Sequence, residues 1–351
     1  MTDSSMLVLV TGAAGWLGKG LIHALRNGLL PNVRPLDPAI TLRLMVLPGD
    51  DVAWLKEFAG NAEIFQGDVR SLEDCRQFVQ GAAGATLFHT AGIIHPKKVW
   101  DFFAINTTGT LNLLQAAEDA DVRRAVIVSS NSPIGCNPTQ DHLFDEASPF
   151  NPYMGYGLSK MRMENGVMRI QERGRLETVR IRAPWFYGPF QPDRQSLFFR
   201  MIRDGKAPVV GSGRNMRSMA YIDNLAQGLM LAASSEAANG KVYWIADEHP
   251  YSMNEIIGTI EAVMEEDFGI RCAHKRMHLP GIAADIAFGV DKTLQSVGIY
   301  HQKIHVLSEM NKTIACSVAL AQKELGYQPT VALRDGMRRS IAWMLQNNQP
   351  L

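Results

Sequence analysis

The sequence has few cysteines, no net charge and no long apolar run. Four cysteines occur among 351 residues, and no two of them have the spacing of metal ligands. Lysine plus arginine and aspartate plus glutamate both total 35, so the formal net charge is zero. The apolar runs are far shorter than the ~20 residues that cross a bilayer, and the first five residues include no basic residue.

These absences disfavour several classes of protein. Scattered cysteines predict reduced thiols in the cytoplasm and no metal site. A balanced charge without a basic stripe argues against a protein that binds nucleic acid by neutralising phosphates. We also expect no secretory leader and no integral membrane association. The 46% of hydrophobic residues is typical of a globular chain, so the composition favours a cytoplasmic enzyme with a small-molecule substrate.

The first half of the chain alternates short apolar runs with segments of helical length. Continuous apolar runs suit parallel strands that are buried on both faces of a sheet. The alternation therefore predicts an α/β fold with a Rossmann-type, doubly wound parallel sheet. The expected strands cover residues 6–10, 41–47, 62–66, 85–89, 124–129 and 178–182.

Three glycines follow the first expected strand directly and open a helical stretch at residues 16–27. Glycine allows a tight turn, close approach of the backbone to a pyrophosphate, and close packing of helix on strand. The N–H groups at the helix N-terminus then face the negative charge. This placement predicts a dinucleotide-binding loop. The expected contacts come from Gly12, Ala14, Gly15, Trp16, Leu17 and Gly18.

The choice between NAD and NADP depends on the end of the second strand. An acid there binds the ribose hydroxyl of NAD, and an arginine accepts the 2′-phosphate of NADP. Here the strand ends in the sequence LPG at residues 47–49, with Asp50 and Asp51 beyond. We expect NAD because no arginine is present, and NADP is not excluded. Asp68, after the third strand, either hydrogen-bonds the adenine edge or caps the next helix.

The second half of the chain has a different character. Glycine and proline become frequent at residues 205–213, and the alternation of strand and helix loosens. We therefore predict two lobes, which the length also suits. The dinucleotide-binding domain takes residues 1–184 and 219–248, and a smaller, discontinuous C-terminal substrate-binding lobe takes residues 185–218 and 249–351.

Tyr156 and Lys160 are four residues apart and share one face of an expected helix. The ordinary pKa of tyrosine, about 10, is too high for a base at neutral pH, and a nearby ammonium lowers it. Such a tyrosine exchanges a proton with a secondary alcohol or ketone while hydride moves to or from a nicotinamide. Ser130 ends the fifth strand, at the edge where α/β sheets bind ligands. We expect it to orient the substrate oxygen.

Together these residues resemble the extended short-chain dehydrogenases/reductases of the NAD-dependent epimerase/dehydratase family. The resemblance runs through nearly the whole chain and includes FHTAG at 88–92, NTTGT at 106–110, YGP at 187–189 and RSMAYIDN at 217–224. It implies a homodimer that pairs helices near residues 100–117 and 153–171. It implies catalysis by Ser130, Tyr156 and Lys160. It also implies cofactor contacts from Asp68, Val69, Thr90, Ala91, Gly92, Asn106, Tyr156 and Lys160.

The resemblance leaves several reactions open. Dehydratases of this family have an acidic pair after the strand-end hydroxyl, whereas Asn131 stands there in this chain, so dehydration is disfavoured. A nucleotide-sugar epimerase or reductase is the leading interpretation. Arg217 lies where that group binds a diphosphate, with Arg200, Arg203 and Arg214 as auxiliaries.

The alternative is an alcohol dehydrogenase or ketone reductase for an apolar substrate, like the 3β-hydroxysteroid dehydrogenases and dihydroflavonol reductases. Residues 278–290, continuing towards 299, resemble the apolar C-terminal helix of that branch. This helix packs in the core, lines an apolar pocket or rests on a membrane surface. Substrate contacts are expected from Ser130, Asn131, Trp185 and Phe186 in either case. A third hypothesis, a non-catalytic redox sensor that binds a dinucleotide, is disfavoured because the tyrosine and the lysine are both present.

Overall fold

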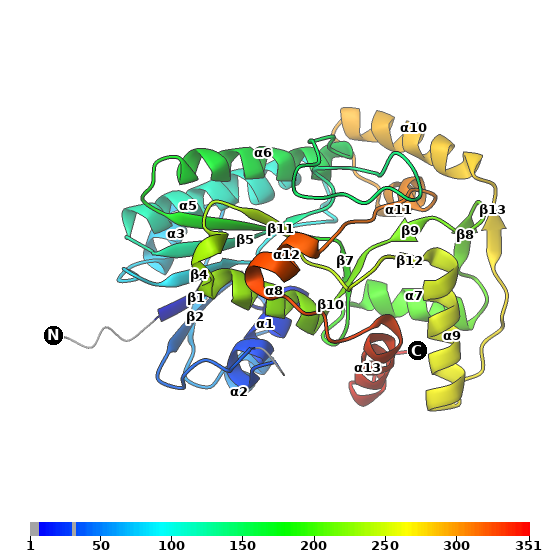
Figure 1. Cartoon of the computed structure of the whole chain (residues 1–351), viewed down its shortest axis with the longest axis horizontal. Helices are drawn as coiled ribbons and strands as arrows, with labels where there is room; N and C mark the ends of the chain where they lie inside the picture. The colour runs from blue at the N-terminus through cyan, green and yellow to red at the C-terminus, as the bar shows by residue number, and fades with distance from the viewer. Residues whose placement is uncertain (1–6, 30–32) are drawn as a thin grey trace.

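The computed structural model describes residues 7–29 and 33–351, and a parallel sheet of seven strands lies at its centre (Figure 1). The strand order is β11-β6-β5-β4-β1-β2-β3, which confirms the predicted Rossmann-type fold. Residue 6 of the first expected strand lies outside the described residues. The strands are β1 (Leu7–Thr11), β2 (Thr41–Val46), β3 (Glu63–Gln66), β4 (Thr86–His89), β5 (Arg124–Ser130), β6 (Glu177–Ala183) and β11 (Val242–Trp244).

The strand order determines where a ligand can bind. β1 lies between β2 and β4, so the chain runs outwards from β1 in both directions. Thr11, the last residue of β1, is in register with His89, the last residue of β4. In open α/β sheets, ligands bind beyond the carboxyl ends of the strands at such a switch point. The glycine loop follows β1 at this edge.

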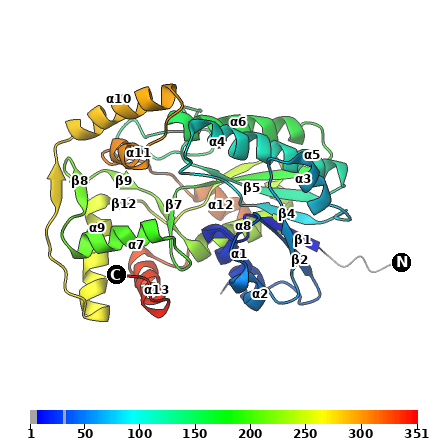
Figure 2. The same ribbon diagram turned by 180° about the vertical axis from the view of Figure 1, so that it is seen from behind.

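Helices cover both faces of the sheet (Figures 1 and 2). α1 packs against α8 on one face, and α3, α5 and α6 pack side by side on the other. Because both faces are covered, the central strands β1 and β4 are almost entirely buried, whereas β6 carries the buried arginines Arg180 and Arg182 between its apolar residues. The elements of this part are α1 (Trp16–Asn27), α2 (Ala53–Phe58), α3 (Leu72–Phe78), α5 (Thr110–Asp119), α6 (Met154–Gln171), α8 (Ile222–Ser234), η2 (Glu236–Ala238) and α12 (Ala319–Leu325).

The remaining elements lie beyond one end of the sheet, on the right in Figure 1. Short strands pair here, β7 with β10, β8 with β13 and β9 with β12, so segments far apart in the sequence meet. The boundaries proposed for the two lobes stay a prediction. The elements are β7 (Trp185–Tyr187), α7 (Asp193–Arg203), β8 (Pro208–Val210), β9 (Met216–Arg217), β10 (Met219–Tyr221), β12 (Tyr251–Ser252), α9 (Met253–Phe268), β13 (Met277–Leu279), α10 (Ile282–Ser296), α11 (Gln302–Glu309) and α13 (Leu333–Gln346).

Two of the expected helices have a different form. The helix expected at 100–117 consists of α4 (Val99–Asp101), a π-helical segment η1 (Phe102–Gly109) and α5. The apolar helix expected from residue 278 begins instead with strand β13, and α10 starts only at Ile282. The intervening Pro280-Gly281 explains this break, because the pair favours a turn.

Two kinds of feature are absent from the described residues, namely a membrane-spanning helix and a cluster of metal ligands. None of the helices in residues 7–29 and 33–351 is long and apolar enough to cross a membrane. The same residues contain no group of three or more His, Cys, Asp or Glu side chains that could hold a metal ion.

Candidate active site

The glycine loop between β1 and α1 is tightly constrained. Gly12 has a φ of 69°, a conformation that favours glycine. A Cβ atom at Gly12 would lie 2.7 Å from the backbone N of Ala91, and one at Gly18 would lie 2.2 Å from the backbone O of Gly12. Gly15 is exposed at the N-terminus of α1, which no side chain caps. Glycine is therefore required for this close packing of the loop, and the uncapped N–H groups at the start of α1 suit the pyrophosphate of a dinucleotide.

The other predicted loop residues are Ala14, Trp16 and Leu17, and Trp16 contacts a distant part of the chain. Leu17 is buried in the core, and Ala14 is partly exposed. Trp16 Nε1 donates a hydrogen bond of 2.7 Å to the carbonyl oxygen of Pro189. Its ring centre lies 4.7 Å from that of Phe186. Trp16 therefore links the glycine loop to β7 and the turn that follows it.

The acids expected near the adenosine bind the protein's own chain. Asp50 and Asp51 each accept a hydrogen bond from a backbone N–H a few residues away. Asp68 forms an ion pair of 2.6 Å with Arg70, and the hydrogen bond from Arg70 lowers the pKa of this carboxyl. The suggestion that Asp68 caps the next helix is wrong, because Ser71 caps α3. Its contact with adenine stays a prediction.

Thr90, Ala91 and Gly92 continue the edge of the sheet beyond β4. Thr90 Oγ1 donates a hydrogen bond of 2.7 Å to the carbonyl oxygen of Thr11. A Cβ atom at Gly92 would lie 3.5 Å from Nζ of Lys160. These three predicted cofactor residues therefore lie between the glycine loop and the predicted catalytic lysine.

A buried histidine joins β1, β4 and α5. His89 Nδ1 lies 2.7 Å from Thr11 Oγ1, and its Nε2 lies 2.8 Å from Thr110 Oγ1. Burial, helped by the charge of Lys160, lowers the pKa of His89 to about 3. The imidazole is therefore neutral at physiological pH and serves as a bridge between the two threonines.

Asn106 lies in η1 and is fully buried. Its Oδ1 accepts a hydrogen bond of 2.8 Å from the backbone N of Ile93, and its Nδ2 donates to Ile93 O at 2.9 Å and to Ser159 Oγ at 3.3 Å. The side chain thus holds the loop after β4 against α6. Val69 is buried against Gly109, at the end of the same segment. Cofactor contacts from Asn106 and Val69 stay predictions.

Tyr156 lies in the first turn of α6 and is partly exposed. Burial raises the pKa of its phenol to about 12, a hydrogen bond with Ser130 acts in the opposite direction, and the charge of Glu309 raises the pKa further. Ser130 Oγ also lies 3.3 Å from Asn131 Oδ1. The structure therefore brings Ser130, Asn131 and Tyr156 together beyond the end of β5.

Lys160 lies one helical turn after Tyr156 and is buried. Its Nζ donates a hydrogen bond of 2.9 Å to the carbonyl oxygen of Val128 in β5. Burial lowers the pKa of this ammonium to about 8, and the charge of Glu164 raises it. The lysine remains mostly charged at neutral pH, close to the tyrosine and to Gly92.

A buried ion pair behind the lysine was missed by the sequence analysis. Glu164 has no exposed surface. It accepts a hydrogen bond of 2.6 Å from Ser129 Oγ and bonds of 3.2 and 2.9 Å from Arg182. The available signal was weak, namely a glutamate four residues after Lys160 on one helix face.

Arg217 lies in β9, and its Nη2 donates a hydrogen bond to the carbonyl oxygen of Glu309. Its Nε is buried and has no partner among the described residues. Arg200 and Arg203, expected as its auxiliaries, instead donate hydrogen bonds to the last two residues of the chain.

The predicted aromatic wall lies beside the glycine loop. Trp185 and Phe186 form part of β7 and are both partly exposed. The ring centre of Trp185 lies 5.5 Å from that of Phe198, and Phe186 packs on Trp16 as described above. Which of the two contacts the substrate stays a prediction.

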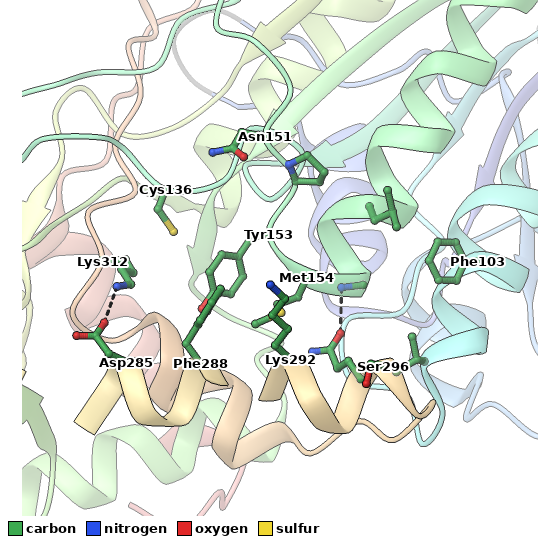
Figure 3. A pocket seen from close by; sticks show the side chains of 15 residues that line it. Phe103, Cys136, Asn151, Tyr153, Met154, Asp285, Phe288, Lys292, Ser296 and Lys312 are labelled. Atoms are coloured by element: carbon green, nitrogen blue, oxygen red, sulfur yellow. Dashed lines mark hydrogen bonds and ion pairs between the residues drawn. The ribbon is translucent and has the colours of Figure 1, made fainter. Parts of the chain in front are cut away.

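A cavity of about 940 Å³ lies between α10 and the start of α6 (Figure 3). Apolar side chains that include Phe103, Leu158 and Phe288 line it, together with Lys292 and Lys312. Tyr156 is not among its lining residues. The cavity therefore lies next to the predicted catalytic tyrosine without including it.

The family model for the NAD dependent epimerase/dehydratase family matches residues 8–246. The chain belongs to this family. The match extends from β1 to just beyond β11 and so covers the glycine loop and the predicted catalytic residues. It confirms the resemblance seen in the sequence, and it identifies the chain as an enzyme of an NAD-dependent family, as expected.

Three known proteins illustrate what this chain is similar to. An uncharacterized protein, y4nL of Sinorhizobium fredii, is 53% identical over 99% of this chain and 98% of its own length. The 3beta-hydroxysteroid-dehydrogenase/decarboxylase isoform 1 of Arabidopsis thaliana is 25% identical over 100% of this chain and 83% of its own length. The crystal structure of DesIV, a dTDP-glucose 4,6-dehydratase from Streptomyces venezuelae with NAD and TYD bound, has a TM-score of 0.75 at 24% identity. It covers 98% of each chain and shows the shared fold.

Proposed function

We propose that this epimerase/dehydratase-family enzyme transfers hydride at a secondary alcohol or ketone of a nucleotide sugar, as an NAD-dependent epimerase or oxidoreductase. The observation that carries the proposal is that Tyr156 and Ser130 lie together beyond the end of β5, with Lys160 one helical turn further along α6 and hydrogen-bonded to Val128 of β5. The uncapped N-terminus of α1 suits the pyrophosphate of the cofactor, and the tight loop before it requires glycine, since a Cβ atom at Gly12 or Gly18 would collide with backbone atoms.

The side chains have distinct parts in this reaction. Bound NAD supplies the hydride acceptor or donor. Tyr156 takes the proton from the substrate hydroxyl or returns it to the carbonyl oxygen. Ser130 donates a hydrogen bond to that oxygen and holds it beside the phenol. Because the pKa of Tyr156 is raised to about 12, the phenolate needs a neighbouring cation, which Lys160 provides.

Arg217 supports a nucleotide sugar as the substrate. Its guanidinium lies in β9 next to the end of α11, and its buried Nε–H has no partner among the described residues. A guanidinium donor of this kind suits a diphosphate oxygen. DesIV, which has the same fold, is named as a dehydratase of the nucleotide sugar dTDP-glucose.

An apolar alcohol or ketone is the second candidate substrate. The cavity of about 940 Å³ next to α6 supports it, because Val99, Phe103, Leu158 and Phe288 line it. The name of the Arabidopsis relative includes a steroid alcohol. A redox sensor without activity is a weaker proposal, because Tyr156 and Lys160 are both present and positioned at one edge of the sheet.

Binding and turnover panels distinguish the two substrates. Purified protein is mixed with NAD and then with UDP, GDP and dTDP sugars, and the melting temperature is measured. We expect at least one sugar to raise it, and Arg217→Ala to abolish that rise while the control Arg338→Ala retains it. A melting temperature that no nucleotide sugar changes would reject this substrate class. Net NADH formation with an apolar secondary alcohol would then favour the second candidate.

The catalytic assignment has its own test. We expect Tyr156→Phe to slow hydride transfer by at least about 100-fold, because the proton acceptor is removed. NAD binding, measured by calorimetry, should stay within about twofold, since the phenol is not part of the glycine loop. Retained turnover in this variant would overturn the role of Tyr156.

Assembly and location also belong to the proposal. We propose a homodimer in which the exposed faces of α5 and α6 pair across a two-fold axis. A groove between these helices is lined by Leu111, Gln115, Gly166, Arg169 and Ile170, among others. We further propose a cytoplasmic location and no association with nucleic acid.

A further inference from the structure

Helix α10 has an apolar face that points away from the protein. Ile282, Ile286 and Val290 recur every four residues along it, and their exposed fractions are 63%, 61% and 44%. Residues four apart share one face of a helix, so the three side chains form a single stripe in solvent. The outer face of a surface helix normally carries polar and charged residues. The stripe is therefore the reverse of the pattern that an ordinary surface helix has.

The exposed apolar surface continues beyond the end of α10. Val297 and Ile299 are 68% and 51% exposed, and Trp100, which precedes η1, is 74% exposed. The two segments lie side by side, because Lys98 and Ile299 form an antiparallel β-bridge. A continuous apolar surface on a protein marks an interaction site more often than scattered side chains do. We call these six side chains the α10 patch, namely Trp100, Ile282, Ile286, Val290, Val297 and Ile299.

The inner face of α10 is fixed on the protein. Asp291 has no exposed surface, and its Oδ2 lies 2.7 Å from Nδ1 of His305 in α11. Gln295 Oε1 accepts a hydrogen bond of 3.0 Å from the backbone N of Gly155 at the start of α6. In Figures 1 and 2 the helix lies along the upper edge of the molecule. The patch is therefore held outwards by a helix that is anchored on its other side.

Cations dominate the exposed charge around the patch. Residues 97–100 and 282–303 include four exposed lysines, namely Lys97, Lys98, Lys292 and Lys303. None of the four forms an ion pair within the part of the chain that the structure describes. The acids of these two segments are already engaged, since Asp285 pairs with Lys312 at 3.1 Å and Asp291 is buried against His305. The surface thus combines apolar side chains with free ammonium groups.

This combination favours a membrane over a protein as the partner. Lysine is depleted at protein–protein interfaces. At a bilayer surface, by contrast, its stem lies along apolar groups while its ammonium binds anionic headgroups. Tryptophan prefers the same boundary between headgroups and acyl chains, as Trp100 would at the edge of the patch. With 15 residues, α10 is shorter than the ~20 that cross a bilayer, so it suits a position in the plane of the surface.

We propose that the α10 patch docks this protein on the surface of an anionic membrane. The apolar side chains enter the boundary between headgroups and acyl chains, and the surrounding lysines bind the anionic headgroups. α10 lies parallel to the surface and does not cross the membrane. The inference goes beyond the proposed function and does not rest on it, because docking requires neither NAD nor a substrate.

Flotation with vesicles tests the docking of the full chain. The purified protein is mixed with vesicles of equal parts phosphatidylcholine and phosphatidylglycerol, or of phosphatidylcholine alone, and is centrifuged through a sucrose gradient. We expect it to float with the anionic vesicles and to stay at the bottom with the neutral ones. Ile286→Gln with Val290→Gln should lower the floating fraction at least about tenfold, because it removes apolar area that enters the membrane. Glutamine keeps the helix intact, since it is a good helix former.

The matched control removes two exposed apolar side chains elsewhere on the molecule. Leu197 in α7 and Leu345 in α13 are 46% and 43% exposed. Leu197→Gln with Leu345→Gln should leave flotation unchanged. Lys98→Glu with Lys292→Glu should also reduce flotation with anionic vesicles, because it replaces attraction to the headgroups by repulsion. An unchanged melting temperature in each variant shows that the fold is intact.

Several results would overturn the proposal. They are a natural protein that stays at the bottom with anionic vesicles, equal flotation with both kinds of vesicle, and unchanged flotation in either patch variant. Light scattering without vesicles tests the other occupant. If Ile286→Gln with Val290→Gln dissociates a natural dimer and the control does not, a second copy of the chain covers the patch instead. Activity is not measured in these experiments, so a failure of the proposed function does not affect them.

Discussion

At the scale of residues, burial determines most of the chemistry of this site. Desolvation raises the pKa of Tyr156 to about 12 and lowers the pKa of Lys160 to about 8. Both shifts favour the neutral side chain. The charge of Glu164 opposes the second shift, so the carboxylate behind the lysine helps to keep the ammonium charged where the tyrosine needs it.

The buried pair of Glu164 and Arg182 leads to a stability prediction. Glu164→Gln leaves the Arg182 guanidinium buried without a counter-charge, so we expect the free energy of unfolding to fall by about 3–5 kcal/mol. Urea denaturation measures it. The control is Glu266→Gln, where the side chain is 66% exposed and a change below about 0.5 kcal/mol is expected. Equal losses in both variants would contradict the prediction.

His89 gives a prediction for acid conditions. Its pKa is lowered from 6.5 to about 3 in the folded protein, so the unfolded chain binds more protons between these values. The stability that the neutral imidazole contributes is therefore complete above pH 6.5 and is lost as the pH falls towards 3. We expect the unfolding free energy of His89→Asn to fall less steeply in this window, by up to about 1.4 kcal/mol per pH unit. Parallel pH profiles for the two proteins would argue against it.

At the scale of elements, the glycine loop and the π-helical segment η1 both lie at the carboxyl ends of the strands, where a ligand is expected to bind. The glycine loop lets α1 begin close to β1 and β4, as the short distances at Gly12 and Gly18 show. The π-helical segment η1 brings Asn106 to the backbone of Ile93. π-Helical turns are frequent at functional sites because they displace one side chain from the regular helical path. Here the displaced side chain fixes the loop that follows β4.

The loop can be tested with a pair of glycine substitutions in helices. In Gly18→Ala the new Cβ would lie 2.2 Å from Gly12 O and 2.8 Å from Ala13 Cα. These are backbone atoms, so the loop must move, and we expect NAD affinity to fall at least about tenfold by calorimetry. Gly258→Ala in α9 meets nothing within 4 Å. It should leave NAD affinity unchanged and raise stability by about 0.5–1 kcal/mol. Unchanged affinity in Gly18→Ala would contradict the assignment.

At the scale of the whole molecule, the two ends of the sheet have different surroundings. One end of the sheet faces α7, α9, α10 and α11 with their short strands, which come from segments before and after β11 (Figure 2). This arrangement allows residues as distant in sequence as Gly155 and Gln295 to bond. The division into a cofactor part and a substrate part stays a prediction.

The proposed homodimer can be tested on α6. Arg162 and Arg169 are exposed on this helix, and replacing both with glutamate would turn any ion pair that they form with acidic side chains of the partner into a repulsion. We expect the natural protein to have twice the mass of one chain by light scattering, and Arg162→Glu with Arg169→Glu to dissociate it. The matched control, Arg334→Glu with Arg338→Glu on α13, should remain a dimer. A monomeric natural protein would reject the proposed assembly.

The strands, the glycine loop and the pairing of Tyr156 with Lys160 could be predicted from the sequence, because each depends on residues that are close together in the chain. Continuous apolar runs predict the central strands because those strands are buried on both faces. The glycines at 12, 15 and 18 mark the loop because backbone contact excludes a side chain there, and Tyr156 and Lys160 share a face because a helix repeats every 3.6 residues. These are local rules, so they can be applied without the fold.

Contacts between residues far apart in the sequence became visible only in the folded structure. The π-helical segment η1, in which Asn106 bonds Ile93, lies where a regular helix was expected, and Arg182 meets Glu164 because β6 lies beside α6. His305 and Glu309 are four residues apart on α11, but Asp291 lies on α10, and only the hairpin of the two helices brings it to His305. Such contacts depend on packing between segments far apart in the chain, and a pattern of neighbouring residues does not contain that information.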